Sequence, residues 1–259
     1  MASRVFLAPP AVVVGHRGMG RGVVEGHDEN TTASLLAAAR LADWVELDVR
    51  RTSDDVLVVG HRPALPAGTP VARATAHAAT AAGLPLLADV LDGLPPRTGV
   101  NLDVKSALED ASVPAQRTTA ALLAPVAARI GAHRRLLVTS FDPAALDVVA
   151  RVAPDVPRGL ITWLWFPVGI AVAAAAGLGV QVLSIHVGSL QPNRYEPKPQ
   201  HPGVRHVVDV AHEAGLEVLA WCPDASHVEE LLRAGVDALC VDDLPAMAAA
   251  LPRRRPADP

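Results

Sequence analysis

Residues 44–61 read WVELDVRRTSDDVLVVGH and contain two short apolar runs that end beside charged side chains. The runs Trp44–Val49 and Val56–Val59 have the length and the β-branched content of buried strands. The link between them, Thr52–Asp55, is too short to hold a helix. This stretch therefore predicts two strands that follow one another directly.

Similar runs occur along the rest of the chain and alternate with Ala- and Leu-rich stretches of helical pattern. They are Val12–Gly15, Gly99–Val104, Arg135–Thr139, Gly159–Thr162, Gln181–Ile185, Glu217–Ala220 and Ala238–Val241. The alternation predicts βα units and a parallel sheet, and 259 residues is the usual size of a (β/α)8 TIM-type barrel. Nine strands are one more than such a barrel needs, so one strand is peripheral or is not a strand.

The expected helices fill the intervals between these strands. They are Thr31–Ala42, Leu86–Leu91, Ala115–Ile130, Pro143–Val152, Val168–Ala176, Pro202–Ala214, Ser226–Ala234 and Pro245–Leu251. Asn30, Thr31 and Thr32 offer N-capping side chains to the first helix. Glycines expected to adopt left-handed C-cap conformations just past four helices are Gly131, Gly177, Gly215 and Gly235.

The organisation is that of one barrel domain, residues 1–251, followed by a tail, Pro252–Pro259, that we expect to be disordered. The weakly patterned segment His61–Gly83 predicts a loop with one short helix, a reduced insertion after the third strand. Leu160–Ile185 is mostly apolar and long enough for a membrane span, but Pro167 and several glycines interrupt it. A strand, a loop, a helix and a strand of a buried barrel account for it better, so no membrane span is expected.

Composition excludes several classes of protein. Half of the residues are hydrophobic and 19% are charged, which indicates a globular chain. The net charge of −4, with no basic cluster beyond Arg253–Arg255, argues against nucleic-acid binding. Cys222 and Cys240 are too few for a disulfide scaffold and fit no zinc motif. We interpret them as reduced thiols of a cytoplasmic protein.

Carboxylates stand at the ends of two predicted strands. Glu46 and Asp48 alternate along one strand, so both face the same side, which in a closed barrel is the interior near the active-site mouth. Two such acids repel each other unless a cation lies between them, and oxygen ligands suit Mg²⁺ or Ca²⁺ better than Zn²⁺. Asp103 ends another strand and is a candidate third ligand, and Lys105 faces the same way two residues later. The alternative is a set of solvated acids.

Histidines follow two of the strands. Each of His16 and His61 alone could be structural, but a pair beside strand-end acids suits general acid–base catalysis. Arg17 is placed to hold a phosphate oxygen, and Gly15 and Gly18 allow tight turns around it. A cation, an arginine, a lysine and two histidines together indicate phosphoester cleavage.

These motifs, taken in order, resemble those of the glycerophosphodiester phosphodiesterase family. The matching stretches are GHRG (15–18), ENT (29–31), ELDVRRTSDDVLVVGH (46–61), NLDVK (101–105), TSFDP (139–143), AWCPD (220–224) and GVDALCVDDLP (235–245). The resemblance implies a phospholipase-C-like phosphodiesterase barrel that hydrolyses glycerophosphodiesters to sn-glycerol 3-phosphate and an alcohol. In many members the substrate's neighbouring hydroxyl attacks first and gives a cyclic phosphate.

The resemblance also implies a role for each of the candidate residues. A divalent cation, Ca²⁺ or Mg²⁺, would be held by Glu46, Asp48 and Asp103; His16 and His61 would be the acid–base pair; Arg17 and Lys105 would bind the phosphate, and Trp221 would line the glycerol pocket.

Departures from the family pattern leave other functions open. Arg62 stands where the family has an acid after its second histidine; it either removes a partner that orients His61 or adds an anion-binding group. Asp103 replaces a glutamate. The aromatic residues Trp163, Trp165 and Phe166 either pack under their loop or form an apolar rim for an acyl chain, as in a lysophospholipase D. A non-catalytic barrel that binds a phosphate ligand is the third alternative.

Overall fold

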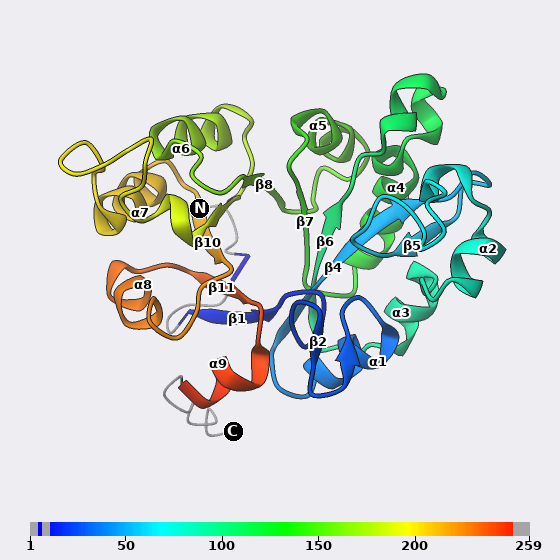
Figure 1. Ribbon diagram of the computed structural model, residues 1–259. Coiled ribbons are helices and arrows are strands. Elements are labelled where there is room, and N and C mark those ends of the chain that lie inside the picture. The colour runs from blue at the N-terminus through cyan, green and yellow to red at the C-terminus, as the bar shows by residue number, and fades with distance from the viewer. Residues whose placement is uncertain (1–4, 7–10, 251–259) are drawn as a thin grey trace.

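Eight parallel strands close on themselves to form a barrel (Figure 1). The computed structural model describes residues 5–6 and 11–250. In chain order the barrel strands are β1 (Val12–Gly15), β4 (Trp44–Arg51), β6 (Gly99–Val104), β7 (Leu136–Ser140), β8 (Arg158–Thr162), β9 (Val182–His186), β10 (Glu217–Trp221) and β11 (Ala238–Val241). Strand β1 pairs in parallel with both β4 and β11, and these pairings close the sheet. The predicted (β/α)8 barrel is confirmed.

The ninth predicted strand is peripheral. It is β5 (Leu57–Val59), which pairs antiparallel with the end of β4. The connection through Thr52–Asp55 is too short to return the chain to the start of β4, so β5 can only run back along its neighbour.

Helices surround the barrel (Figure 1). They are α1 (Thr32–Ala38), α3 (Leu87–Gly93), α4 (Thr119–Gly131), α5 (Pro143–Val152), α6 (Val168–Gly177), α7 (Val204–Glu213), α8 (Val228–Ala234) and α9 (Leu244–Ala250). Shorter elements lie in the loops: the hairpin β2 (Val23–Val24) and β3 (His27–Asp28), helix α2 (Ala76–Ala81), and the 3-10 turns η1 (Val71–Arg73), η2 (Leu108–Ser112), η3 (Ala115–Arg117) and η4 (Val187–Ser189). The segment 61–83 thus holds one short helix, as predicted.

Capping residues end several helices as predicted, but two of the four predicted C-cap glycines do not act as caps. Thr31 caps α1, its side chain accepting from the N–H of Ser34 at 3.2 Å. Gly215 and Gly235 adopt the expected left-handed conformation, with φ of +79° and +85°. The prediction is wrong for Gly131 and Gly177, which are the last residues of α4 and α6.

Four predicted helices, α1, α4, α7 and α8, are shorter than expected. Helix α4 begins at Thr119, because Ala115–Arg117 forms the separate 3-10 turn η3 and Thr118 has an extended backbone. Helix α8 begins at Val228 rather than at Ser226. Helix α1 stops at Ala38 because the chain then tightens into turns with hydrogen bonds three residues apart. Helix α7 begins only at Val204 because Gly203 has a φ of +85°, which no right-handed helix accommodates.

The apolar stretch Leu160–Ile185 is divided between β8, α6 and β9, as expected. Within residues 5–6 and 11–250, no helix combines the length and the apolarity needed to cross a membrane. The predicted tail, Pro252–Pro259, lies outside the described residues.

The barrel interior is apolar at one end and polar at the other. Trp44 packs there with β-strand side chains such as Val14 and Leu137, and Phe6 meets its ring edge-on at 5.3 Å between centroids. A Cβ at Gly99 would overlap the Trp44 ring, so the apolar end of the barrel requires glycine at this position. Because side chains alternate along β4, Glu46 and Asp48 follow Trp44 towards the opposite, polar end.

Candidate active site

Three buried carboxylates meet at the polar end of the barrel. Glu46 and Asp48 lie on β4, and the register of β6 sets Asp103 beside Asp48. One oxygen of each lies within 4.8 Å of the others. Burial, together with the charge of Asp48, raises the pKa of Glu46 to about 7. Burial also raises the pKa of Asp103 to about 6, against the attraction of Lys105. The charge of Asp48 therefore disfavours the ionised forms of both Glu46 and Asp103.

This group of oxygens fits a hard divalent cation. Asp103 Oδ1 is buried and accepts no hydrogen bond from any residue that the structure describes. A buried oxygen without a donor is costly unless another group satisfies it. Carboxylate-only sites suit Mg²⁺ or Ca²⁺, so the chemistry of the trio agrees with the residues present.

Lys105 supplies a positive charge directly beside the acids. Its Nζ lies 2.8 Å from Asp48 Oδ1 and also pairs with Asp103. Burial opposes protonation, but the neighbouring carboxylates raise the pKa of Lys105 well above its usual value. Although burial opposes it, Lys105 also holds the pKa of Asp48 far below the ordinary range. The Lys105–Asp48 pair therefore stays charged.

His16 is held by an acid on the last strand. It follows β1, and its Nδ1 lies 2.5 Å from Asp242 Oδ1, just beyond β11. Its other nitrogen, Nε2, lies 3.9 Å from Glu46. Burial would lower the pKa of His16, but hydrogen bonds with Asp242 and Cys222 and the charge of Glu46 raise it to about 10. Asp242 thus fixes the ring, with Nε2 towards the carboxylates.

His61 approaches the same group from the other side. Its Nδ1 lies 3.2 Å from Asp48 Oδ2, and its side chain is 41% exposed. Arg50 holds the backbone here, its guanidinium donating to the carbonyls of Gly60 and His61, the latter at 2.6 Å. The neighbouring Arg62 is exposed. The carboxylate beside His61 is therefore that of Asp48 on β4.

A tight turn brings Arg17 over the acids. Arg17 has a left-handed φ of +55°, and its N–H donates to Glu46 at 2.8 Å. Its guanidinium lies 2.9 Å from Glu29 and 3.3 Å from Asp48. Gly15 permits the turn, because a Cβ there would collide with the Gly18 carbonyl oxygen. The GHRG motif thus positions both a histidine and an arginine.

Sequence comparison identifies the family to which this arrangement belongs. The model of the "Glycerophosphoryl diester phosphodiesterase family" matches residues 16–246. The chain belongs to this family. It is an enzyme of the phosphoric diester hydrolase class, as its motifs predict. No curated protein matches the chain.

Solved structures of phosphodiesterases share the fold. A glycerophosphodiester phosphodiesterase from Parabacteroides distasonis is 22% identical, with a TM-score of 0.74 over 94% of this chain and 98% of its own. One from Thermotoga maritima is 17% identical, with a TM-score of 0.70 over 94% and 99%. A phosphodiesterase from Oleispira antarctica, solved in complex with the product sn-glycerol-3-phosphate, is 23% identical, with a TM-score of 0.69 over 93% and 96%.

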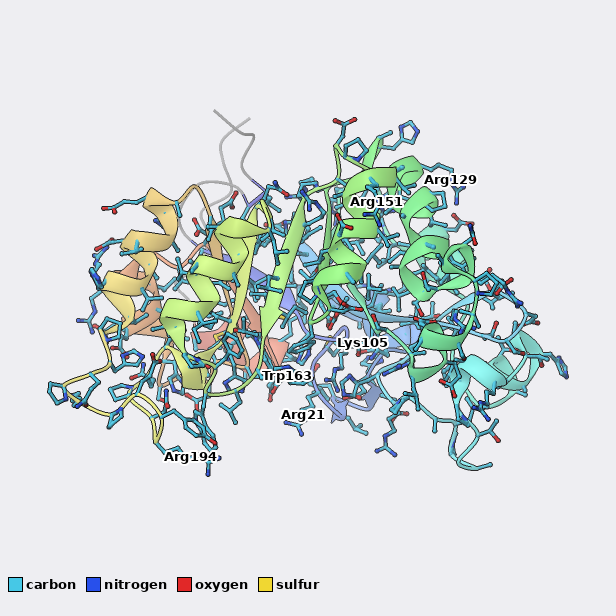
Figure 2. All side chains as sticks on the ribbon, turned by 90° about the horizontal axis from the view of Figure 1, so that it is seen from above. Arg21, Lys105, Arg129, Arg151, Trp163 and Arg194 are labelled. Atoms are coloured by element: carbon cyan, nitrogen blue, oxygen red, sulfur yellow. The ribbon has the colours of Figure 1, made fainter. Side chains whose placement is uncertain are left out.

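A row of three aromatic side chains, which we call the aromatic row, leads from Lys105 to solvent: Phe141, Trp163 and Trp221. Lys105 Nζ lies 5.4 Å from the centroid of the Phe141 ring, and Phe141 stacks on Trp163 at 4.0 Å. Trp221 meets Phe141 edge-on at 6.1 Å. Trp163 is 62% exposed, and Figure 2 shows it at the same end of the barrel as Lys105, with Arg129 and Arg151 at the other end. Phe166, by contrast, packs against the hydrophobic core.

Several residues that contact the site were given no role in it from the sequence. They are Asn30, Arg50, Phe141, Cys222 and Asp242. Asn30 donates to Asp48 at 2.7 Å and accepts from its N–H at 3.1 Å. Asp242 carried a usable signal, because it directly follows a predicted strand just as His16 does. The others act on site residues through contacts that only the folded chain creates.

Proposed function

We propose that the protein hydrolyses glycerophosphodiesters to sn-glycerol 3-phosphate and an alcohol, with His16 and His61 transferring protons and Glu46, Asp48 and Asp103 holding a divalent cation. The observation that supports this most directly is the placement of the two histidines. Both lie beside the carboxylate trio: Nε2 of His16 is 3.9 Å from Glu46, and Nδ1 of His61 is 3.2 Å from Asp48. The reaction needs one ring on each side of the phosphorus centre, and these contacts set one ring beside each of the two carboxylates of β4.

Each residue has a distinct task in this reaction. The guanidinium of Arg17 and the ammonium of Lys105 bind and orient the anionic phosphate oxygens. One histidine removes the proton of the substrate's neighbouring hydroxyl as that oxygen bonds to phosphorus, and the other donates a proton to the departing alcohol, which leaves a cyclic phosphate. Water then opens the cyclic phosphate with the two proton-transfer roles reversed, and sn-glycerol 3-phosphate is released. A cation bound by the trio would supply positive charge against the negative charge that develops on the phosphate.

Release of sn-glycerol 3-phosphate from glycerophosphocholine tests the proposal. Activity should disappear on treatment with EDTA and return with Ca²⁺ or Mg²⁺. His16→Ala and His61→Ala should each lose at least about 100-fold in kcat, the usual contribution of a general acid or base. His133→Ala, an exposed histidine just beyond α4, is the matched control and should keep full activity.

Different failures have different meanings. A fully active His61→Ala variant would remove His61 from the mechanism and leave the carboxylate site intact. Binding of glycerol 3-phosphate without turnover of any diester in Ca²⁺, Mg²⁺ or Mn²⁺ would instead favour the non-catalytic, phosphate-binding barrel.

Lysophospholipids are a second class of candidate substrate, favoured by the aromatic row. Trp163 joins the site through Phe141 yet leaves most of its own surface in water. Trp165 and Leu164 beside it are also exposed, at 37% and 44%. An exposed apolar surface that is continuous with a polar site suits a substrate with an acyl chain.

The lipid hypothesis predicts a substrate-dependent loss. Trp163→Ala should raise KM for a lysophospholipid but leave KM for glycerophosphocholine nearly unchanged. Val152→Ala removes an exposed apolar side chain at the end of α5 and serves as control. An equal rise in KM for both substrates would assign Trp163 a packing role and count against the lipid hypothesis.

A further inference from the structure

A second group of potential metal ligands lies beside the carboxylate trio. His16, Cys222 and Asp242 follow the neighbouring strands β1, β10 and β11, and one ligand atom of each lies within 4.8 Å of the others. The group differs in chemistry from the trio, because it offers a nitrogen, a sulfur and an oxygen. Three strand ends thus bring His16 together with two residues that lie more than 200 positions later in the sequence.

Such a donor set suits zinc rather than magnesium or calcium. Zn²⁺ accepts imidazole, thiolate and carboxylate ligands in a tetrahedron at about 2.0–2.3 Å, whereas Mg²⁺ and Ca²⁺ take oxygen ligands. Ligand atoms in such a tetrahedron lie about 3–4 Å apart. His16 Nδ1 and Asp242 Oδ1 are now 2.5 Å apart, so side-chain movements of about 1 Å would admit the ion.

The two thiols of the chain differ in access. Cys222 is half-buried at the mouth, whereas Cys240 is 3% exposed and packs within the barrel interior. The N–H of Cys222 donates to the carbonyl of Cys240 at 2.9 Å, which fixes the chain at this point of the mouth. Cys222 is therefore the thiol that a dissolved ion or reagent can reach.

We propose that His16, Cys222 and Asp242 form a thiophilic zinc site, separate from the carboxylate site, and that zinc bound there stops catalysis. The ion displaces the proton between His16 Nδ1 and Asp242 and the proton of the Cys222 thiol, so two protons pass to solvent. With zinc on Nδ1, the nitrogen Nε2 that faces the carboxylates keeps its proton and can accept no other, and release of that proton would leave an imidazolate, so His16 can no longer serve as an acid–base group. Zinc binding stands on the geometry alone, while the inhibition rests on the proposed role of His16.

Cobalt spectroscopy and thiol protection test the binding directly. With the carboxylate site saturated by excess Mg²⁺, Co²⁺ should give a thiolate-to-cobalt charge-transfer band, and Zn²⁺ should protect one thiol from Ellman's reagent. Loss of an outer-shell partner already costs about 10–100-fold in metal affinity, so Cys222→Ser should weaken zinc binding by at least about 100-fold. Cys240→Ala, the matched control, should keep both signals. Equal zinc affinity in Cys222→Ser and the unmodified protein would overturn the site.

Activity tests the second half of the proposal. Zn²⁺ should inhibit glycerophosphocholine hydrolysis in excess Mg²⁺, and Cys222→Ser should need about 100-fold more zinc for the same fractional inhibition of its own rate. Zinc bound through Cys222 without inhibition would refute the inhibitory role. If the protein hydrolyses no diester at all, the proposed function fails, yet the cobalt band still decides whether the site exists.

Discussion

Replacing Asp103 with asparagine should stabilise the metal-free protein and remove its response to divalent cations. The side chain is buried with two other carboxylates, and its Oδ1 accepts no hydrogen bond within the described part of the chain. Asparagine has nearly the same shape and no charge. The substitution therefore removes repulsion, together with one ligand of the proposed cation site.

The size of the effect follows from the pKa of Asp103, which burial raises from 3.8 to about 6. One pKa unit corresponds to about 1.4 kcal/mol, so ionising Asp103 costs the folded state on the order of 3 kcal/mol. Lys105 attracts the ionised form of Asp103, but burial together with the charge of Asp48 outweighs that attraction. For a chain of this size the gain corresponds to roughly 6–12 °C in Tm.

The sign depends on pH. The folded-state pKa is raised, so the stability that Asp103 contributes is fully present below about pH 4 and is lost as pH rises through about 6. Asp103→Asn escapes this loss. The two proteins should thus have similar stability near pH 4, and the variant should be more stable at pH 8.

Thermal and urea unfolding between pH 4 and 8, with EDTA or with excess Mg²⁺ or Ca²⁺, measures the difference. Asp110→Asn is the control, because Asp110 is a largely buried acid that pairs with Arg51 at 2.6 Å and lies outside the trio. It should destabilise by about 1.5–3 kcal/mol and keep the cation response. An Asp103→Asn protein less stable than the unmodified protein in EDTA at pH 8 would refute the reasoning.

Other perturbations test single contacts. Arg50→Lys loses the guanidinium that donates to the carbonyls of Gly60 and His61, so kcat should fall by up to about 100-fold with little change in Tm. An unchanged kcat would show that the position of His61 does not depend on these hydrogen bonds. Gly99→Ala forces a methyl group against the Trp44 ring and should lower the free energy of unfolding in urea by about 1–3 kcal/mol; an unchanged free energy would mean that Trp44 can move aside. Thr31→Ala removes the cap of α1 and should cost about 1 kcal/mol, with Thr31→Ser restoring most of it.

Local sequence was enough for the architecture. Short apolar runs such as Trp44–Val49 and Gly99–Val104 predict strands, because a barrel strand is buried on both faces and carries apolar side chains on each of them. The polar residues that end these runs predict one shared site, because parallel strands deliver their carboxyl ends to the same edge. The structure brings the trio and both histidines together, and the proposed catalytic roles remain predictions.

Some features depended on geometry that local pattern does not contain. Gly131 and Gly177 precede chain reversals, as C-caps do, yet each is still helical because the following residue continues the turn. Phe166 and Trp163 are both large aromatic residues and lie in the same loop, so the sequence does not distinguish them. Phe166 packs against the core, whereas Trp163 stacks on Phe141 and is 62% exposed. A turn separates them, in which the N–H of Phe166 donates to the carbonyl of Trp163 and Trp165 has a left-handed φ of +61°.

By itself, then, the sequence determined the barrel, the strand ends that carry polar side chains and the family. Only the tertiary structure decided how those side chains pair. Asp242 orients His16 across 226 positions, and Asp48, rather than the residue after His61, is the acid beside that histidine. Strand pairing and barrel closure make these contacts, and they depend on register across the whole sheet, which no short stretch of sequence specifies.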